Sequence, residues 1–370
     1  MFSQDYELLK NNPSTVLLED GARLVLISGD YQARVMTSSS QGMSGYSYGW
    51  INHELIKSGE QTPHMNAYGG EERFWLGPEG GQFSIYFGAN MAFEFQNWQT
   101  PSIIDSVNYP LMDRNKTSAT FFKEFEIFNY SGTKFKAKID RKISLLTEKE
   151  VSDFLHFDPK NLAWVAYQTE NKLTNIGEND WSKTSGLLSI WLLGMLKASD
   201  QNTVIIPYQK GQESGINDAY FGKIPSDRLV KKEGILFFKA DAKHRGKIGI
   251  APHALIPLAA SFDPQNLVLT ILQFDFKGDL DYVNSMWEIQ KEPFQGDVLN
   301  AYNDGKNDLG TQMGQFYELE SSSPAKELKV NETLSHTQRT YHFHGDFDEL
   351  NVLSKQLLGT DLSLVYTIFK

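Results

Sequence analysis

The chain has 370 residues, a formal net charge of −11 at neutral pH and no cysteine. Without cysteine it can form no disulfide, thiolate metal site or cysteine nucleophile, and an acidic chain without a basic tract is not expected to bind nucleic acid. The longest apolar run, residues 186–196, is shorter than the roughly 20 residues that span a bilayer. We therefore expect a buried strand there and no interaction with a membrane.

The N-terminus lacks the cationic start and apolar core of a signal peptide. We accordingly expect a cytoplasmic protein. A periplasmic location stays open because a chain without cysteine is compatible with either compartment. The sequence leaves the oligomeric state unknown.

Apolar and polar side chains alternate with a period of two through most of the chain, which predicts antiparallel strands. Helical spacing is confined to segments 6–11, 148–154 and 346–358, with Asp346 as the expected N-cap of the last one. The expected strands are 121–130, 135–145, 163–169, 203–207, 235–240 and 267–276. No linker or short-period repeat divides the chain. The prediction is an all-β protein in which residues 1–370 form one large antiparallel β-sandwich domain with a few short helices.

Residues 68–87, YGGEERFWLGPEGGQFSIYF, combine two glycine pairs with carboxylates, Arg73 and Trp75. Glycine lets the backbone approach a ligand closely, arginine offers paired hydrogen bonds, and tryptophan offers a flat surface for stacking. This composition predicts one side of a site for a small polar ligand. His53 and His64 lie just upstream and are further candidates, although a single histidine is more often a surface or core residue.

The segment 315–324, QFYELESSSP, places Glu318 and Glu320 two residues apart, and thus on one face of a strand. A buried pair of like charges raises the pKa of one member, which suits general acid or base catalysis. The alternative is that both carboxylates face solvent.

The loop 296–310 carries Asn303, Asp304 and Asp308 among other polar residues. Their oxygens suit a hard cation or sugar hydroxyls, but no glutamate closes an EF-hand pattern. A hairpin loop ending in glycine is the more typical interpretation.

His342 and His344 share a face of a strand, so a metal pair is geometrically possible. The helix start at Asp346 is the preferred interpretation of this segment, and we predict neither a metal nor a cofactor. A nucleophile elbow, a P-loop, a dinucleotide fingerprint and the HExxH motif are all missing from the sequence.

Three segments together resemble the galactose mutarotase-like superfamily of aldose 1-epimerases. Residues 69–75, GGEERFW, resemble its glycine-glycine-arginine segment. Residues 173–177, LTNIG, resemble the segment with its catalytic histidine, and residues 317–324 the strand and loop with its catalytic glutamate. The segments occur in the family's order, and the resemblance covers roughly residues 15–345. The tryptophan and Pro-Glu pair that follow the first segment are similar to a divergent bacterial branch.

The resemblance implies a β-supersandwich fold and a sugar as substrate. In the family, a glutamate takes the proton of the anomeric hydroxyl while a histidine protonates the ring oxygen. Carried over, Glu320 is the expected general base. Asn175 stands where the catalytic histidine is expected and has no proton to give, so His64, His53 or another residue would have to supply it. Of these, His64 is the candidate acid.

The expected sugar-binding residues are Arg73, Glu72, Trp75, His53, Asn175, Asn303 and Asp304. The expected function is that of a carbohydrate-active protein resembling aldose 1-epimerases, with a small sugar or a glycan as its partner. A carbohydrate-binding protein without catalysis is the alternative, as is a lyase or hydrolase built on a related sandwich.

Overall fold

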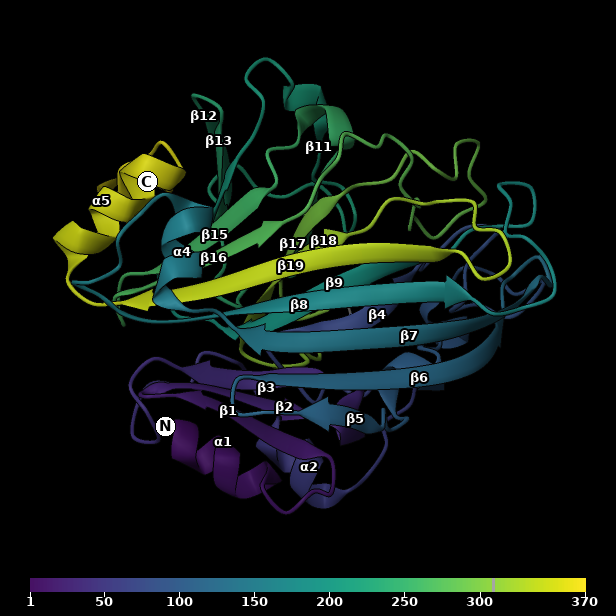
Figure 1. Ribbon diagram of the computed structural model, residues 1–370. Coiled ribbons are helices and arrows are strands. Elements are labelled where there is room, and N and C mark those ends of the chain that lie inside the picture. The colour runs from purple at the N-terminus through teal and green to yellow at the C-terminus, as the bar shows by residue number, and fades with distance from the viewer. Residues whose placement is uncertain (308–309) are drawn as a thin grey trace.

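Antiparallel strands form three sheets in the computed structural model, which describes residues 1–307 and 310–370 (Figure 1). The candidate Asp308 therefore lies outside the described residues. The largest sheet has the order β12 (Leu229–Lys232), β13 (Ile235–Lys239), β10 (Thr203–Pro207), β15 (Leu258–Asp263), β16 (Val268–Phe274), β19 (Thr333–His344), β8 (Ala163–Asn175), β7 (Lys134–Leu145), β6 (Ser118–Phe128) and β5 (Leu111–Arg114). The second has the order β11 (Ile216–Asn217), β14 (Gly246–Ile250), β17 (Leu299–Asn303), β18 (Phe316–Ser322), β9 (Ser189–Lys197) and β4 (Arg73–Gly77). The third consists of β1 (Thr15–Asp20), β2 (Arg23–Ser28) and β3 (Arg34–Ser39).

The alternation in the sequence corresponds to the two faces of the sheets. In β7, Phe135, Ala137 and Ile139 are buried between the layers, and the lysines between them face outward. Strand β9 is buried on both faces, which explains its nearly continuous apolar sequence. The predicted all-β antiparallel sandwich is confirmed.

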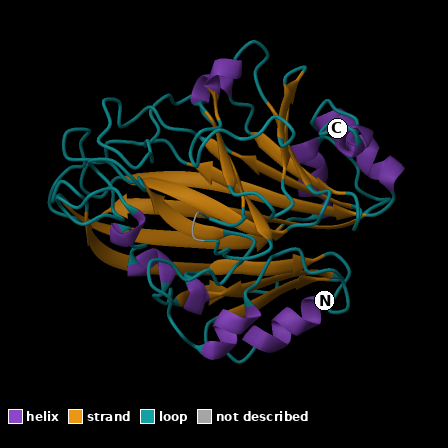
Figure 2. Cartoon of the chain, turned by 180° about the vertical axis from the view of Figure 1, so that it is seen from behind, coloured by secondary structure: helices purple, strands orange, loops and turns teal. Residues whose placement is uncertain are grey.

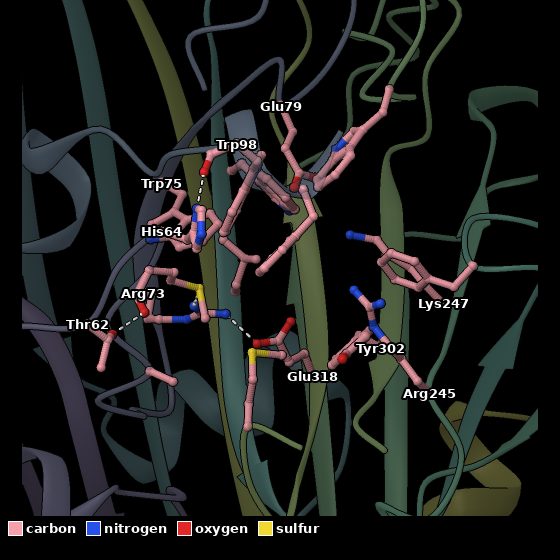
Figure 3. A pocket seen from close by; sticks show the side chains of 18 of the residues that line it. Thr62, His64, Arg73, Trp75, Glu79, Trp98, Arg245, Lys247, Tyr302 and Glu318 are labelled. Atoms are coloured by element: carbon pink, nitrogen blue, oxygen red, sulfur yellow. Dashed lines mark hydrogen bonds and ion pairs between the residues drawn. The ribbon is translucent and has the colours of Figure 1, made fainter. Parts of the chain in front are cut away.

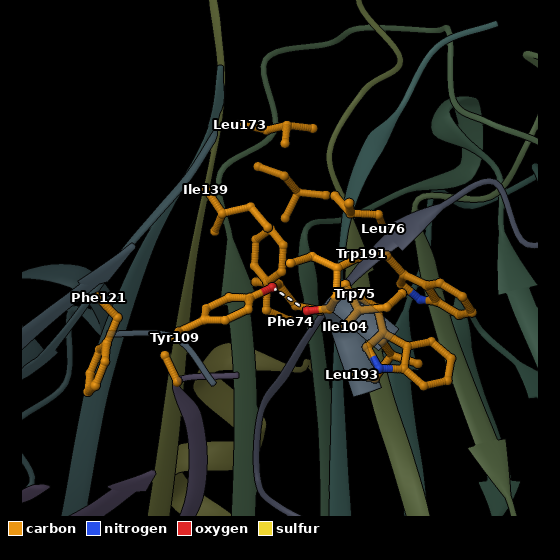
Figure 4. Packing of buried hydrophobic residues seen from close by; sticks show 14 of the residues in the cluster. Phe74, Trp75, Leu76, Ile104, Tyr109, Phe121, Ile139, Leu173, Trp191 and Leu193 are labelled. Atoms are coloured by element: carbon orange, nitrogen blue, oxygen red, sulfur yellow. Dashed lines mark hydrogen bonds between the residues drawn. The ribbon is translucent and has the colours of Figure 1, made fainter. Parts of the chain in front are cut away.

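The six-stranded and three-stranded sheets together cover the inner face of the ten-stranded sheet. An antiparallel bridge between Val35 of β3 and Glu72, the residue before β4, links the neighbouring edges of the two smaller sheets. Figure 4 shows Phe74 and Leu76 of β4 near Ile139 and Leu173 of the ten-stranded sheet, within one buried cluster. Because Phe74 and Leu76 point into this core, Arg73 and Trp75 must point to the outer face of the six-stranded sheet.

Short helices lie around the periphery of the sheets (Figures 1 and 2). The α-helices are α1 (Phe2–Leu9), α2 (His53–Ser58), α3 (Ser102–Asp105), α4 (Glu148–Leu155) and α5 (Phe347–Leu357). The 3-10 helices are η1 (Gly29–Tyr31), η2 (Phe95–Asn97), η3 (Glu213–Gly215), η4 (Pro252–Ala254) and η5 (Leu362–Tyr366). Helices α4 and α5 match the predicted segments, and Asp346 caps α5 by accepting the backbone N–H of Asp348 at 2.9 Å. Helix α1 begins earlier than expected. No helix in the described part of the chain is both long and apolar enough to cross a membrane.

Candidate functional site

The outer face of the six-stranded sheet is the floor of a cavity of about 280 Å³ (Figure 3). Neighbouring strands contribute side chains in register: Arg73 lies opposite Leu193, and Glu318 lies opposite Tyr302, which lies opposite Lys247. The cavity is lined by Thr62, Pro63, His64, Met65, Ala67, Arg73, Trp75, Glu79, Phe95, Trp98, Trp191, Leu193, Phe221, Arg245, Lys247, Trp287, Tyr302, Met313 and Glu318. Most of this lining is aromatic or apolar, with a few charged groups that converge, as is typical of small-molecule sites.

An ion pair between Arg73 and Glu318 lies on this floor (Figure 3). Both side chains are almost buried, at 2% and 8% exposure. The guanidinium of Arg73 also lies 4.8 Å from the ring of Trp75, which places a cation against an aromatic face. Burial raises the pKa of the Glu318 carboxyl above its ordinary value, although the charge of Arg73 opposes this. Glu318 is thus a nearly buried carboxyl with a raised pKa that faces the cavity.

Glu320, two residues along β18, is directed to a different environment. Its side chain is fully buried, and one carboxylate oxygen accepts hydrogen bonds from Lys247 Nζ and Trp191 Nε1, both at 2.9 Å. Burial alone would lower the pKa of Lys247, but the carboxylates of Glu320 and Glu79 outweigh it and raise that pKa. Glu320 is not among the residues that line the two cavities. Its ion pair fixes the position of the Lys247 ammonium, which does line them. The general-base role predicted for Glu320 remains a prediction.

His64 forms part of the aromatic wall opposite Lys247 and Arg245 (Figure 3). Its Nδ1 lies 2.6 Å from the backbone oxygen of Trp98, and its ring lies 4.6 Å from that of Phe95. A carbonyl oxygen can only accept, so Nδ1 of His64 is the donor in this contact. The φ of 69° at His64 is an uncommon conformation for a residue with a side chain. The hydrogen bond to Trp98 therefore holds a candidate acid at the cavity wall.

A second cavity of about 550 Å³ adjoins the first and shares Glu79, Arg245, Lys247 and Trp287 with it. Asp304 lines this second cavity. Its two carboxylate oxygens accept the Tyr302 hydroxyl at 2.7 Å and the Gly314 N–H at 2.8 Å. Burial raises the pKa of Asp304 and that of Glu79. The two cavities together offer room for a ligand larger than a single ring.

The structure places Glu72 away from the cavity, in the core between the sheets. Its carboxylate pairs with Arg141 at 2.7 Å, and neither side chain is exposed. The other oxygen accepts the amide of Gln338 of β19 at 2.7 Å. Neighbouring residues of an extended chain point to opposite faces, so Arg73 reaches the cavity and Glu72 does not. A direct contact between Glu72 and a ligand in this cavity is thus inconsistent with the geometry.

Asn175, Asn303 and His53 are also outside both cavities. The buried amide of Asn175 donates to the backbone oxygens of Asn179 and Leu328, at 2.9 and 3.1 Å. The amide of Asn303 bonds the backbone of Ala242 at 2.8 Å and of His244 at 2.9 Å. His53 begins α2 and pairs with Asp5 of α1. These polar groups stabilise loops and helices. Of the predicted site residues, those that line the cavities are Arg73, Trp75, His64 and Asp304.

His342 is held between two side chains of the core. Its Nε2 lies 3.0 Å from a carboxylate oxygen of Glu71, and its Nδ1 lies 2.9 Å from the hydroxyl of Thr270. No group of three potential metal ligands is found among residues 1–307 and 310–370.

Several cavity residues were not singled out from the sequence. Arg245 and Lys247 come from β14 and the residue before it, where the sequence RGKIGI alternates but carries no recognisable motif. Trp98, Trp191 and Trp287 come from segments far apart in the chain, and only the fold brings them together. The local signal in this segment is that charged and uncharged residues alternate from Arg245 to Lys247, which is typical of a strand with one polar face.

Comparisons with known proteins agree with this fold. A model described as "Family of unknown function (DUF6786)" matches residues 1–369. A search of curated proteins gives no match. Among solved structures, a protein from Synechocystis sp. PCC 6803 aligns with a TM-score of 0.56 and 11% identity, over 90% of this chain and 97% of its own. A galactose mutarotase-like protein from Lactobacillus casei aligns with a TM-score of 0.52 and 10% identity, over 89% of this chain and 99% of its own. A proposed aldose 1-epimerase from Escherichia coli K12 aligns with a TM-score of 0.51 and 10% identity, over 90% of this chain and 99% of its own. At these identities the similarity shows the galactose mutarotase-like fold alone.

Proposed function

Given that this chain belongs to the DUF6786 family, we propose that it binds a sugar in the cavity on the outer face of the six-stranded sheet and interconverts its anomers. The observation that carries this proposal is the Arg73–Glu318 ion pair on the cavity floor, beside the ring of Trp75. A carboxylate and a guanidinium can share the hydroxyls of a sugar, and an aromatic ring can cover its C–H face. The galactose mutarotase-like fold supports this choice of ligand class.

The size and lining of the cavity support a sugar as well. A volume of about 280 Å³ is at the small end of ligand pockets, and the adjoining 550 Å³ extends it. Trp98 and Trp287 stack with ring centroids 6.0 Å apart, next to the His64 ring. Sugar rings are amphipathic, with polar edges and apolar faces. A cavity with charged groups on the floor and aromatic rings on the walls is complementary to that shape.

We assign the general base to Glu318 because it is the carboxylate of β18 that lines the cavity. Glu318 would take the proton of the anomeric hydroxyl, and the bond between the anomeric carbon and the ring oxygen would break. Protonated His64, fixed through Nδ1 to Trp98, would donate the proton on Nε2 to that ring oxygen. The aldehyde turns, the ring closes on its other face, and both protons return, so that atoms and charges balance. Positioned acids and bases each contribute about 10²- to 10⁴-fold to such reactions.

Binding of a sugar without catalysis is a second candidate, and one observation favours it. The Glu318 carboxylate is already paired with Arg73, and a base held by a cation is a weaker base. In that case Glu318 and Arg73 would serve only to hold hydroxyls. The two candidates share the site and differ in turnover.

The test has two measurements on the same protein. Saturation-transfer NMR with a panel of aldoses detects binding, and polarimetry starting from the pure α anomer detects interconversion. We expect at least one aldose to bind and to reach anomeric equilibrium faster than in buffer, and Glu318→Gln to abolish the acceleration. Binding without acceleration would leave the second candidate, and an absence of binding across the panel would reject both. Glu126→Gln, at an exposed position of β6 where Glu126 pairs with the exposed Lys134, is the matched control.

A further inference from the structure

Two cations from β14 and the residue before it face the junction of the two cavities. Arg245 and Lys247 are two residues apart, and both line both cavities (Figure 3). Lys247 is paired with Glu320. Arg245 stacks on the ring of Phe221 at 3.9 Å, and within the described residues it has neither a hydrogen bond nor an ion pair to a carboxylate. A guanidinium has five N–H donors, so Arg245 brings a positive charge and donors without a protein partner in the described residues to the cavity wall. Burial raises the pKa of the Asp304 and Glu79 carboxyls, and the charge of Arg245 acts at longer range to oppose that rise.

The carboxyl groups around this wall are engaged elsewhere. Asp304 accepts the Tyr302 hydroxyl and the Gly314 N–H, and Glu318 is paired with Arg73. Burial raises the pKa of Glu79, and the charge of the neighbouring Lys247 opposes that rise. Glu288 also lines the larger cavity but is exposed to solvent, where its charge is screened. Of the three lining cations Arg73, Arg245 and Lys247, Arg245 is thus the one without a carboxylate ion pair in the described residues.

We propose that Arg245, with Lys247 beside it, binds an anionic substituent of the sugar, a carboxylate or a phosphate, in the larger cavity. This inference rests on the proposed sugar site and specifies its ligand class as an acidic sugar. The planar fork of arginine matches both anions through paired hydrogen bonds, and the ammonium of Lys247 adds a second charge. The ring of such a sugar would lie toward Trp287, which lines both cavities. The same charges would disfavour amino sugars.

The experiment compares D-glucose with D-glucuronate and D-glucose 6-phosphate by isothermal titration calorimetry. These ligands share a ring and differ in having no anion, a carboxylate or a phosphate. The variants are Arg245→Gln, which removes the charge, and Arg245→Lys, which keeps it. Arg114→Gln is the matched control, because Arg114 is an exposed arginine of β5, at the edge of the ten-stranded sheet. Lys247 is left intact because its loss would strand the buried Glu320.

We expect the wild-type protein to bind one acidic sugar about tenfold or more tightly than glucose, since hydrogen bonds to a charged group are strong. Arg245→Gln should remove that preference and change glucose binding less than about twofold, and Arg245→Lys should retain part of it. The preferred acidic sugar identifies the anion as carboxylate or phosphate. Equal affinity for all three sugars, or an Arg245→Gln effect as large on glucose as on the acidic sugar, would overturn the inference and leave the sugar site standing. Binding of no sugar would reject the proposed function together with it.

Discussion

Replacement of Glu318 by glutamine keeps the shape of the side chain and removes its charge from the cavity floor. Burial raises the pKa of this carboxyl in the folded chain above its usual 4.5. The folded state thus binds the proton more tightly than the unfolded chain does, and the contribution of Glu318 to stability declines as pH rises from 4.5 through the folded pKa. At neutral pH Glu318→Gln removes a disfavoured charge, but it also leaves the buried guanidinium of Arg73 without its carboxylate. These two effects oppose each other, so we expect a smaller loss in the free energy of unfolding than a buried ion pair of two favourable charges would show.

The same replacement at Glu320 should lower stability more. Glu320 is fully buried, and its partner Lys247 is 11% exposed. Glu320→Gln leaves the ammonium of Lys247 without its carboxylate in a nearly dry environment. Removing one partner of a buried ion pair costs about 3–5 kcal/mol. The two carboxylates on this strand face are thus expected to differ in how much their replacement lowers the free energy of unfolding.

Urea denaturation and polarimetry on both variants provide the test. We expect Glu318→Gln to lower the denaturation midpoint less than Glu320→Gln does, and to lose about 10²- to 10⁴-fold of the anomer interconversion rate. Glu320→Gln should show a lower midpoint, and any remaining folded protein should stay active. The reasoning would be refuted if Glu318→Gln kept its rate while folded Glu320→Gln lost it, since Glu320 would then be the base.

Truncation of Trp287 to alanine should weaken sugar binding about five- to tenfold in titration calorimetry, because this half-buried ring lines both cavities. Truncation of the exposed Phe128 to alanine is the control and should have no effect on binding. Equal losses of affinity in the two variants would argue against stacking of the sugar on Trp287. Arg141→Met should lower the free energy of unfolding by about 3–5 kcal/mol in urea, since it leaves the Glu72 carboxylate buried and unpaired; a loss below about 1 kcal/mol would contradict the ion-pair argument. Burial lowers the pKa of His336 from 6.5 to about 4, so the unfolded chain binds more protons between these values and stability should fall as pH drops from 6.5 to 4, by about 3 kcal/mol from this residue. His336→Gln should flatten that part of the stability–pH curve, and an unchanged curve would show that His336 is not responsible.

Local patterns were enough to predict most of the fold. The alternation in residues 135–145 matches β7, and the segment beginning at Asp346 matches α5, because strand faces and helix caps depend on neighbouring residues. The same pattern contains Arg141, a charge at a core position. Its partner Glu72 lies 69 residues away in the chain, so the buried pair could only be identified from the fold.

The site was predictable only in part. The sequence placed Glu318 and Glu320 on one face, and the structure agrees, but which of them meets the cavity depends on Lys247 from another strand. The composition of residues 68–87 points to Arg73 and Trp75, and the orientation of both side chains follows from the alternation of faces along β4. Asn175 was chosen by resemblance, and its amide is used by the backbone of a loop that the sequence did not reveal.

The aromatic walls of the cavity have an optical consequence. The chain has seven tryptophans, and Trp75, Trp98, Trp191 and Trp287 are all in the lining of one cavity. A ligand that displaces water from these indoles changes the surroundings of four of the protein's seven tryptophans. The emission spectrum of the unlabelled protein should therefore shift on ligand binding, which makes the protein its own sensor for screening compounds of unknown affinity.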